Sequence, residues 1–111
     1  MGLKTVLYIS EPLSKFIEGG LPPEFSAIHR QARINNQRSG ITGLLGFSAG
    51  RYLQILEGDE VSVDSTFEKI EKDSRHRILA VLVNHVVDQR FFEGCSMRVV
   101  ASLSDCDEFD E

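Results

Sequence analysis

The sequence predicts one α+β domain with the element order β-α-β-β-α-β-β. Apolar residues alternate with period two in several short stretches, and they recur every three or four residues in two longer ones. A chain of 111 residues, 41% of them hydrophobic, can bury one small core. We assign residues 1–103 to this domain and residues 104–111, SDCDEFDE, to an acidic C-terminal tail.

The first strand is expected over Thr5–Ser10, where alternation puts Val6, Tyr8 and Ser10 on one face. A helix should begin near Pro22-Pro23, because proline in a first helical turn loses no hydrogen bond. Three- and four-residue spacing then predicts one helix face that packs on the sheet. Its members are Phe25, Ile28, Ala32 and Asn36.

Two apolar strands follow between Asn35 and Gly58, joined by a short turn over Ser48–Arg51. Gln54 lies on the second of these strands and points to the same face as Tyr52 and Leu56. An unpaired amide on a buried face costs roughly 1–3 kcal/mol, so Gln54 needs a partner. Either the fold or a bound ligand supplies it.

A second helix is predicted over Asp59–Lys72, with Asp59 as its N-cap and an apolar stripe facing the sheet. The stripe consists of Val63, Phe67 and Ile70.

The next strand, Ile78–His85, is apolar on both faces, which favours an interior position in the sheet. In the connection Val86–Gly94 we expect Phe91 and Phe92 to pack against the core. The alternating segment Ser96–Leu103 is the predicted last strand.

Four polar side chains are therefore expected to converge on one otherwise apolar space. They offer a phenol, a hydroxyl and two amides, from Tyr8, Ser10, Asn36 and Gln54. Apolar walls with a few donors and acceptors suit a flat, uncharged ring with polar edges. Nothing in this group is typical of a catalytic acid, a catalytic base or a metal site.

Composition excludes several classes of function. The net charge of −5, from 17 acidic and 12 basic residues, argues against nucleic-acid binding through a general basic surface. No apolar run is long enough to cross a membrane, and the first residues already read as a strand. Cys95 and Cys106 have no metal-ligand spacing. We expect a cytoplasmic protein with two thiols, no nucleic-acid partner and no membrane partner.

Five short motifs follow one another along the chain: LYIS at Leu7–Ser10, NNQRSGITGLL at Asn35–Leu45, RYLQILEG at Arg51–Gly58, KDSRH at Lys72–His76 and CSM at Cys95–Met97. Together they resemble the motifs of a BLUF domain, a sensor of blue light using flavin, from Leu3 to about Val100. The resemblance implies a ferredoxin-like α+β fold, with two helices packed on one face of a mixed sheet. It also implies FAD bound non-covalently between the helices.

The resemblance places the flavin ring beside Tyr8, Asn36 and Gln54. It implies further residues in or near the pocket: Ser10, Asn35, Arg75, His76 and Met97. For Arg75 and His76 an alternative is a simple interaction with the end of the second helix. FMN and riboflavin share the ring that these residues would contact, so either remains possible in place of FAD.

The function that the resemblance implies is that of a blue-light photoreceptor and not of an enzyme. Excitation would drive electron and proton transfer from Tyr8 to flavin, and Gln54 would then rearrange its hydrogen bonds. The new bond at the flavin C4 carbonyl would give a red-shifted signalling state. Tyr8 and Gln54 are therefore the implied photoactive pair.

The sequence departs from the family at its C-terminal end. Many members have tryptophan at the position of Cys95, and this chain has no tryptophan. It also stops soon after Met97, as a minimal sensor or one excised from a longer protein would. We expect the outer sheet face to bind a second copy or an effector domain.

Two other functions share this order of elements. One is a small acylphosphatase-like hydrolase, which needs an anion cradle after the first strand. The corresponding loop, EPLSKFIEGG, opens with an acidic residue. The other is a non-photochemical module for ligand binding or protein interaction, in which Tyr8 and Gln54 are core polar groups. A yellow purified protein would support the flavin hypothesis, and a colourless one that flavin cannot reconstitute would exclude it.

Overall fold

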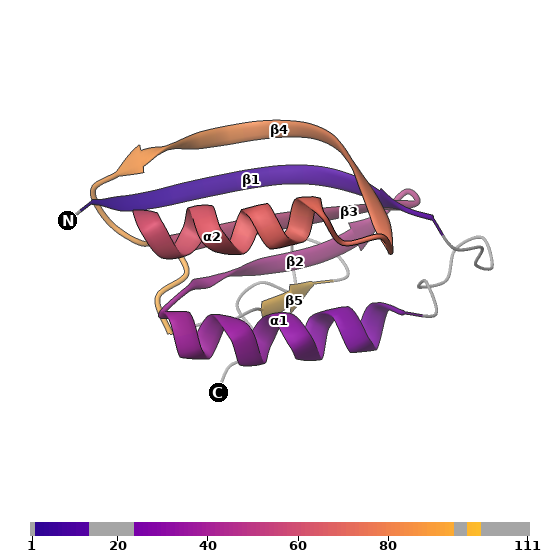
Figure 1. The fold of residues 1–111 in the computed structure, drawn as a ribbon, viewed down its shortest axis with the longest axis horizontal. Helices are drawn as coiled ribbons and strands as arrows, with labels where there is room; N and C mark the ends of the chain where they lie inside the picture. The colour runs from indigo at the N-terminus through magenta and orange to yellow at the C-terminus, as the bar shows by residue number, and fades with distance from the viewer. Residues whose placement is uncertain (1, 14–23, 95–97, 101–111) are drawn as a thin grey trace.

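The computed structural model describes residues 2–13, 24–94 and 98–100 (Figure 1). The predicted order β-α-β-β-α-β-β is confirmed. The elements are β1 Leu3–Pro12, α1 Phe25–Ser39, β2 Thr42–Ser48, β3 Arg51–Asp59, α2 Glu60–Glu71, β4 His76–Val87 and β5 Arg98–Val100. Neither helix is long and apolar enough to cross a membrane.

The strands form one mixed sheet in the order β4-β1-β3-β2-β5. The pairs β4–β1, β1–β3 and β3–β2 are antiparallel, whereas β2 and β5 are parallel. The central pair places Tyr8 opposite Gln54 and Ser10 opposite Tyr52. Cross-strand partners share a face of the sheet, so these four side chains emerge on the same side.

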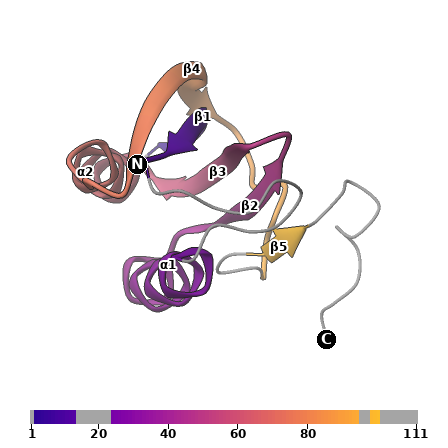
Figure 2. The same cartoon turned by 90° about the vertical axis from the view of Figure 1, so that its right-hand side faces the viewer.

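Both helices cover that side of the sheet, as Figure 2 shows. Helix α2 packs on β1 and β3, and α1 lies against β2. Between helices and sheet lies the core, which includes the predicted stripe of α2. The buried members are Val6, Tyr8, Phe25, Ile41, Leu45, Tyr52, Leu56, Val63 and Phe67. The expected arrangement of two helices on one face is therefore confirmed.

The helix boundaries follow local capping. The carboxylate of Asp59 accepts a hydrogen bond from the backbone N–H of Val61, so its predicted N-cap role is confirmed. Helix α1 begins at Phe25, later than the proline pair, and residues 22–23 lie outside the described part of the chain. It ends at Ser39, and Gly40 follows as its C-cap with a φ of 68°.

The turn between β2 and β3 fixes the register of the central strands. Ala49 and Gly50 both have positive φ, 54° and 78°, which suits a two-residue hairpin between twisted strands. The hairpin sets Leu45 opposite Gln54. Gln54 is therefore flanked by Tyr8 on β1 and by Leu45 on β2.

Strand β4 is an edge strand, so the prediction of an interior position was wrong. Leu79, Val81 and Leu82 are 40–55% exposed. Apolar residues on both faces indicate high β propensity, and this propensity does not determine a strand's place in the sheet.

The connection after β4 is held by polar contacts and not by apolar packing of Phe91, whose side chain is 73% exposed. The prediction for Phe91 was therefore wrong, and Phe92 is only partly buried. The backbone N–H groups of Phe91 and Phe92 donate to the carboxylate of Glu57 at 2.6 and 2.9 Å. Thr42 Oγ1 donates to the same carboxylate at 2.9 Å. Glu57 is 1% exposed, so its carboxylate joins this connection firmly to the sheet.

The last strand is described only at Arg98–Val100, within the predicted range Ser96–Leu103. Its parallel pairing places Val99 beside Leu45 in the backbone register. Cys95, Met97 and the tail at residues 104–111 lie outside the described residues.

Candidate functional site

A cavity of about 310 Å³ lies between the two helices and the sheet. Ligand pockets in proteins have volumes from about 300 Å³ upward. Seven of the eight predicted site residues line it: Tyr8, Ser10, Asn35, Asn36, Gln54, Arg75 and His76. The eighth, Met97, is outside the described residues. The structure thus brings together side chains from β1, α1, β3 and the segment that opens β4.

Tyr8 and Gln54 form a hydrogen-bonded pair on the wall of this cavity. They are opposite each other on β1 and β3, and both are almost completely buried. The phenol hydroxyl of Tyr8 donates to Oε1 of Gln54. The buried carbonyl of Gln54 therefore has a partner inside the fold, while its side chain also lines the cavity.

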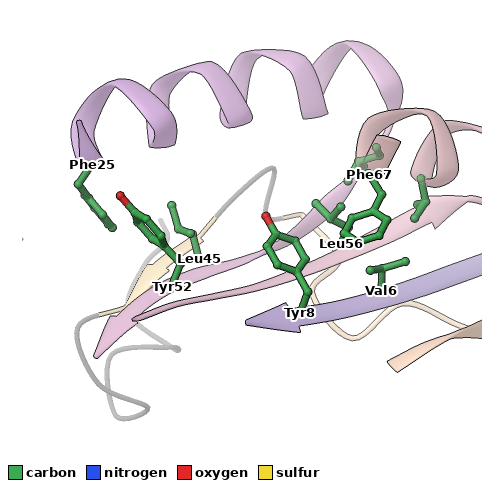
Figure 3. Close-up of a cluster of buried hydrophobic side chains, with 9 residues drawn as sticks. Val6, Tyr8, Phe25, Leu45, Tyr52, Leu56 and Phe67 are labelled. Atoms are coloured by element: carbon green, nitrogen blue, oxygen red, sulfur yellow. The ribbon is translucent and has the colours of Figure 1, made fainter. Parts of the chain in front are cut away.

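The surroundings of Tyr8 keep its phenol protonated. Burial raises the pKa of Tyr8 well above 10, and the nearby Asp73 and Tyr52 raise it further. The rings of Phe67 and His76 pack against it, with centroids 5.4 and 6.2 Å away. Figure 3 shows its hydroxyl pointing from the sheet toward α1. At physiological pH this group is a hydrogen-bond donor and not a phenolate.

Asn36 lies near the C-terminal end of α1 and is 1% exposed. Its backbone carbonyl accepts from the N–H of Gly40 and from the N–H of Ile41 at 2.8 Å. These hydrogen bonds fix the end of the helix. They thereby also fix the position of the Asn36 side-chain amide on the cavity wall. Asn35, one residue earlier, is exposed at the same cavity.

His76 links the first strand to the end of the second helix. Its Nε2 lies 3.0 Å from the carbonyl oxygen of Ile70, and its Nδ1 lies 2.8 Å from Oγ of Ser10. A carbonyl oxygen only accepts, so Nε2 donates, and in the neutral ring Nδ1 accepts from Ser10. His76 thus contacts the helix end, as one interpretation expected, and it also lines the cavity.

Arg75 bridges the cavity between the loop before β4 and helix α1. Its guanidinium donates to both carboxylate oxygens of Asp73, at 2.6 to 3.2 Å, and to Oε1 of Gln31 at 2.8 Å. The hydrogen bonds from Arg75 hold the pKa of Asp73 below its usual value, and those to Asp73 raise the pKa of Arg75. A fixed positive charge thus lies on the cavity wall.

Seven polar residues that line the cavity were not predicted as site residues: Gln31, Arg38, Ser39, Tyr52, Thr66, Lys69 and Asp73. Two of these residues could have been found from the sequence. Tyr52 shares a strand face with Gln54, and Asp73 belongs to the KDSRH motif. The apolar walls include Ile28, Ala32, Leu45 and Ile70.

These groups fit a flavin. A phenol, two amides and an imidazole offer neutral donors and acceptors to the edge of a planar ring, and apolar side chains offer contact to its faces. The hydroxyl of Tyr52 is buried without a hydrogen-bond partner among the described residues, as expected where a ligand completes the site. Across the described part of the chain, no three His, Cys, Asp or Glu side chains are grouped as metal ligands.

Comparison with known proteins agrees with this fit. The family model described as "Sensors of blue-light using FAD" matches residues 3–98. Photoactivated adenylate cyclase subunit alpha of Euglena gracilis is 32% identical over 93 residues, which are 81% of this chain and 8% of that protein. The chain spans only 8% to 11% of the length of the first curated relatives that it matches.

Solved structures show the same fold. Klebsiella pneumoniae BlrP1 with FMN and cyclic diGMP has a TM-score of 0.75 at 32% identity, covering 89% of this chain and 26% of that one. The dark-state structure of BlrB, a BLUF protein, has a TM-score of 0.78 at 30% identity, covering 90% of this chain and 73% of that one.

These matches decide between the functions that the sequence left open. A hydrolase of the acylphosphatase kind and a non-photochemical module are both set aside, because the family model covers nearly the whole chain. The fold, the cavity and the relatives agree on a photosensor that binds flavin. The chain belongs to the BLUF family of blue-light sensors.

Proposed function

We propose that the light signal in this domain begins with a change at the hydrogen bond between Tyr8 and Gln54. One observation carries the proposal: the Tyr8 hydroxyl donates directly to Gln54 Oε1 on the wall of the cavity. A bound flavin supplies a chromophore that absorbs blue light and accepts an electron when excited.

Tyr8 is suited to donate that electron. A phenol that loses an electron becomes strongly acidic, so its proton leaves toward the nearest acceptor, which is Gln54 Oε1. Gln54 could take this proton on its oxygen while an N–H proton leaves its nitrogen toward the bound flavin that holds the electron, or its amide could rotate. When the electron returns to Tyr8, a proton would return with it, so the phenol is restored and Gln54 is left rotated or with a proton moved from its nitrogen to its oxygen. No product is released, so the process is a reversible switch.

The other residues of the cavity are proposed to hold the ring in place. Asn36 is fixed by the bonds that end α1, and Arg75 is fixed by Asp73 and Gln31. His76 and Ser10 are tied to each other across β1 and β4. Static partners of this kind keep a ligand in register while one neighbouring group moves. For Asn35 and Met97 a role in the pocket remains a prediction.

We propose FAD as the native flavin. The description of the matching family names FAD, while FMN is present in one structure of BlrP1. The residues proposed here would contact the ring that these flavins and riboflavin share. Flavin released by denaturing the purified protein and identified by chromatography tests this choice: FMN or riboflavin alone would contradict it.

The signal is proposed to leave through β2 and β5. Gln54 is opposite Leu45 on β2, and Leu45 is paired in register with Val99 on β5. A change at Gln54 therefore lies two strands from the last described strand, with backbone hydrogen bonds connecting them.

The sheet face opposite the helices is the proposed docking surface for an effector domain. Neither helix covers it, and its row of Leu7, Ile9, Leu53 and Ile55 is only half-buried. The curated relatives are many times longer than this chain, and an uncovered apolar face commonly marks an interface.

Hydrogen exchange, measured in the dark and under blue light, tests both the output route through β5 and the docking surface. Unchanged exchange in residues 98–100 would contradict the output route. If exchange on this face slows as the protein dimerises at higher concentration, the partner that docks there is a second copy and not an effector domain.

The electron donor can be tested by flavin fluorescence. Electron transfer from Tyr8 competes with emission, so the bound flavin should be weakly fluorescent in the native protein. In Tyr8→Phe the fluorescence lifetime should lengthen severalfold. An unchanged short lifetime in that variant would show that another group supplies the electron.

A further inference from the structure

The cavity contains a second phenol. The chain has two tyrosines and no tryptophan, and both tyrosines line the same cavity. Tyr52 lies on β3, two residues before Gln54 and opposite Ser10. Only 3% of Tyr52 is exposed.

Packing fixes the ring of Tyr52. Phe25 stacks on it at a centroid distance of 6.2 Å and an interplanar angle of 11°. Phe47 and His76 meet it edge-on, at 5.2 and 6.3 Å. Figure 3 shows the Tyr52 hydroxyl pointing from the sheet toward α1, as the hydroxyl of Tyr8 does. Because three rings surround Tyr52, its hydroxyl cannot turn to another partner without disrupting the cluster.

The two phenols differ in their partners. The hydroxyl of Tyr8 is bonded to Gln54, whereas that of Tyr52 is buried with no hydrogen-bond partner among residues 2–13, 24–94 and 98–100. Folded proteins rarely leave a buried polar group unpaired, because its lost hydration is not replaced. A phenylalanine would fill the same space among these rings without that cost. The presence of the hydroxyl therefore indicates a partner that enters the cavity.

We propose that Tyr52 is a flavin-binding residue whose hydroxyl donates a hydrogen bond to an acceptor on the bound flavin. The inference rests on the proposed function, since it assigns a ligand contact in the same cavity. It adds a second phenol with a role unlike that of Tyr8: Tyr52 binds and positions the ligand, and Tyr8 takes part in the switch.

The state of the phenol agrees with a donor role. Burial raises the pKa of Tyr52 to about 12, and Glu24 contributes in the same direction while Arg75 opposes it. The hydroxyl thus keeps its proton throughout the physiological range.

The test compares Tyr52→Phe with Thr5→Val, because Thr5 Oγ1 is also buried without a hydrogen-bond partner among the described residues but does not line the cavity. Flavin-loaded protein is diluted, and release of FAD is followed by the gain in its fluorescence. Loss of one ligand hydrogen bond should weaken FAD binding by about five- to tenfold in Tyr52→Phe. In Thr5→Val the affinity should change less than twofold, because Thr5 does not line the cavity.

A second measurement is the dark absorption spectrum, which should shift in Tyr52→Phe if an acceptor on the flavin loses its donor. Native affinity together with an unshifted dark spectrum would overturn the inference. So would a lower unfolding temperature with native affinity, since the hydroxyl would then be paired within the protein. Failure of the native chain itself to bind flavin would instead refute the proposed function.

Discussion

Tyr8 and Gln54 lie opposite each other on the two central strands of the sheet, and the Tyr8 hydroxyl donates to the Gln54 side-chain oxygen. The contact joins residues 46 positions apart in sequence and is buried. Strand pairing sets their separation, so the pair forms with the fold itself. A ligand that enters the cavity meets an arranged donor and acceptor.

Tyr8→Phe should retain flavin and lose the light-induced red shift. The phenylalanine ring keeps the contact with Phe67, but it has no hydroxyl proton to give to Gln54. Tyr52 remains in the cavity, yet none of its described contacts is a hydrogen bond to Gln54. Absorption spectra before and after blue light check this prediction. A normal, reversible shift in the variant would exclude Tyr8 as the required donor.

Gln54→Leu should bind flavin and stay in its dark spectrum under blue light. Leucine has a similar volume but neither a donor nor an acceptor, so the hydrogen bonds have no group that can rearrange. The same illumination experiment measures the outcome. If the red shift persisted, some group other than Gln54 would have to make the new bond.

Asn36→Ala is the matched control for Gln54→Leu, because it removes another buried amide from the same cavity. It should weaken flavin binding or move the dark spectrum, while the light-induced shift survives. A loss of the shift in this variant would mean that Asn36 takes part in the switch.

Asp73→Asn should reduce stability at neutral pH and lose this effect in acid. Hydrogen bonds from Arg75 hold the pKa of Asp73 below its ordinary value of 3.8. The ionised Asp73 carboxylate therefore makes its full contribution to stability above that value. This contribution disappears as the pH falls through the lower pKa that Asp73 has in the folded state. We expect the variant to be about 1 kcal/mol less stable at neutral pH. Urea unfolding across the acid range checks it. A difference between variant and native protein that does not change with pH would contradict the assignment.

Glu57→Gln should loosen the connection between β4 and β5. The carboxylate accepts from two backbone N–H groups and from Thr42, and an amide offers only one accepting oxygen. We expect a loss of about 2 kcal/mol in the free energy of unfolding, since bonds to a buried charge are strong. Hydrogen exchange at the amides of Phe91 and Phe92 should also become faster.

Asp64→Asn provides the control, because it weakens the surface ion pair between Lys4 and Asp64. This change should cost less than about 1 kcal/mol. Equal losses in the two variants would argue against a special role for Glu57.

The sequence predicted which side chains share a face but not which of them meet. Alternation put Tyr8 and Ser10 on one side of the first strand, and helical spacing put Asn36 toward the sheet. All three line the cavity. The bond from Tyr8 to Gln54 depends on the pairing of two distant strands, which no local pattern encodes.

Long-range pairing also explains the errors. The apolar composition of Ile78–His85 favoured an interior strand, yet the described structure pairs β4 with β1 alone. Phe91 was expected in the core, but the buried acceptor Glu57 holds its backbone and leaves the ring exposed. Tyr52 was placed on the correct face, but only the structure shows that its buried hydroxyl has no hydrogen-bond partner among the described residues.

The absorption spectrum of the flavin-loaded protein before and after blue light tests the central claim most directly. Rearrangement of Gln54 beside an oxidised flavin predicts a shift of the visible band to longer wavelength, with no loss of its intensity and full reversal in the dark. An unchanged spectrum, or a bleached one that recovers only when oxygen is supplied, would contradict the hydrogen-bond switch.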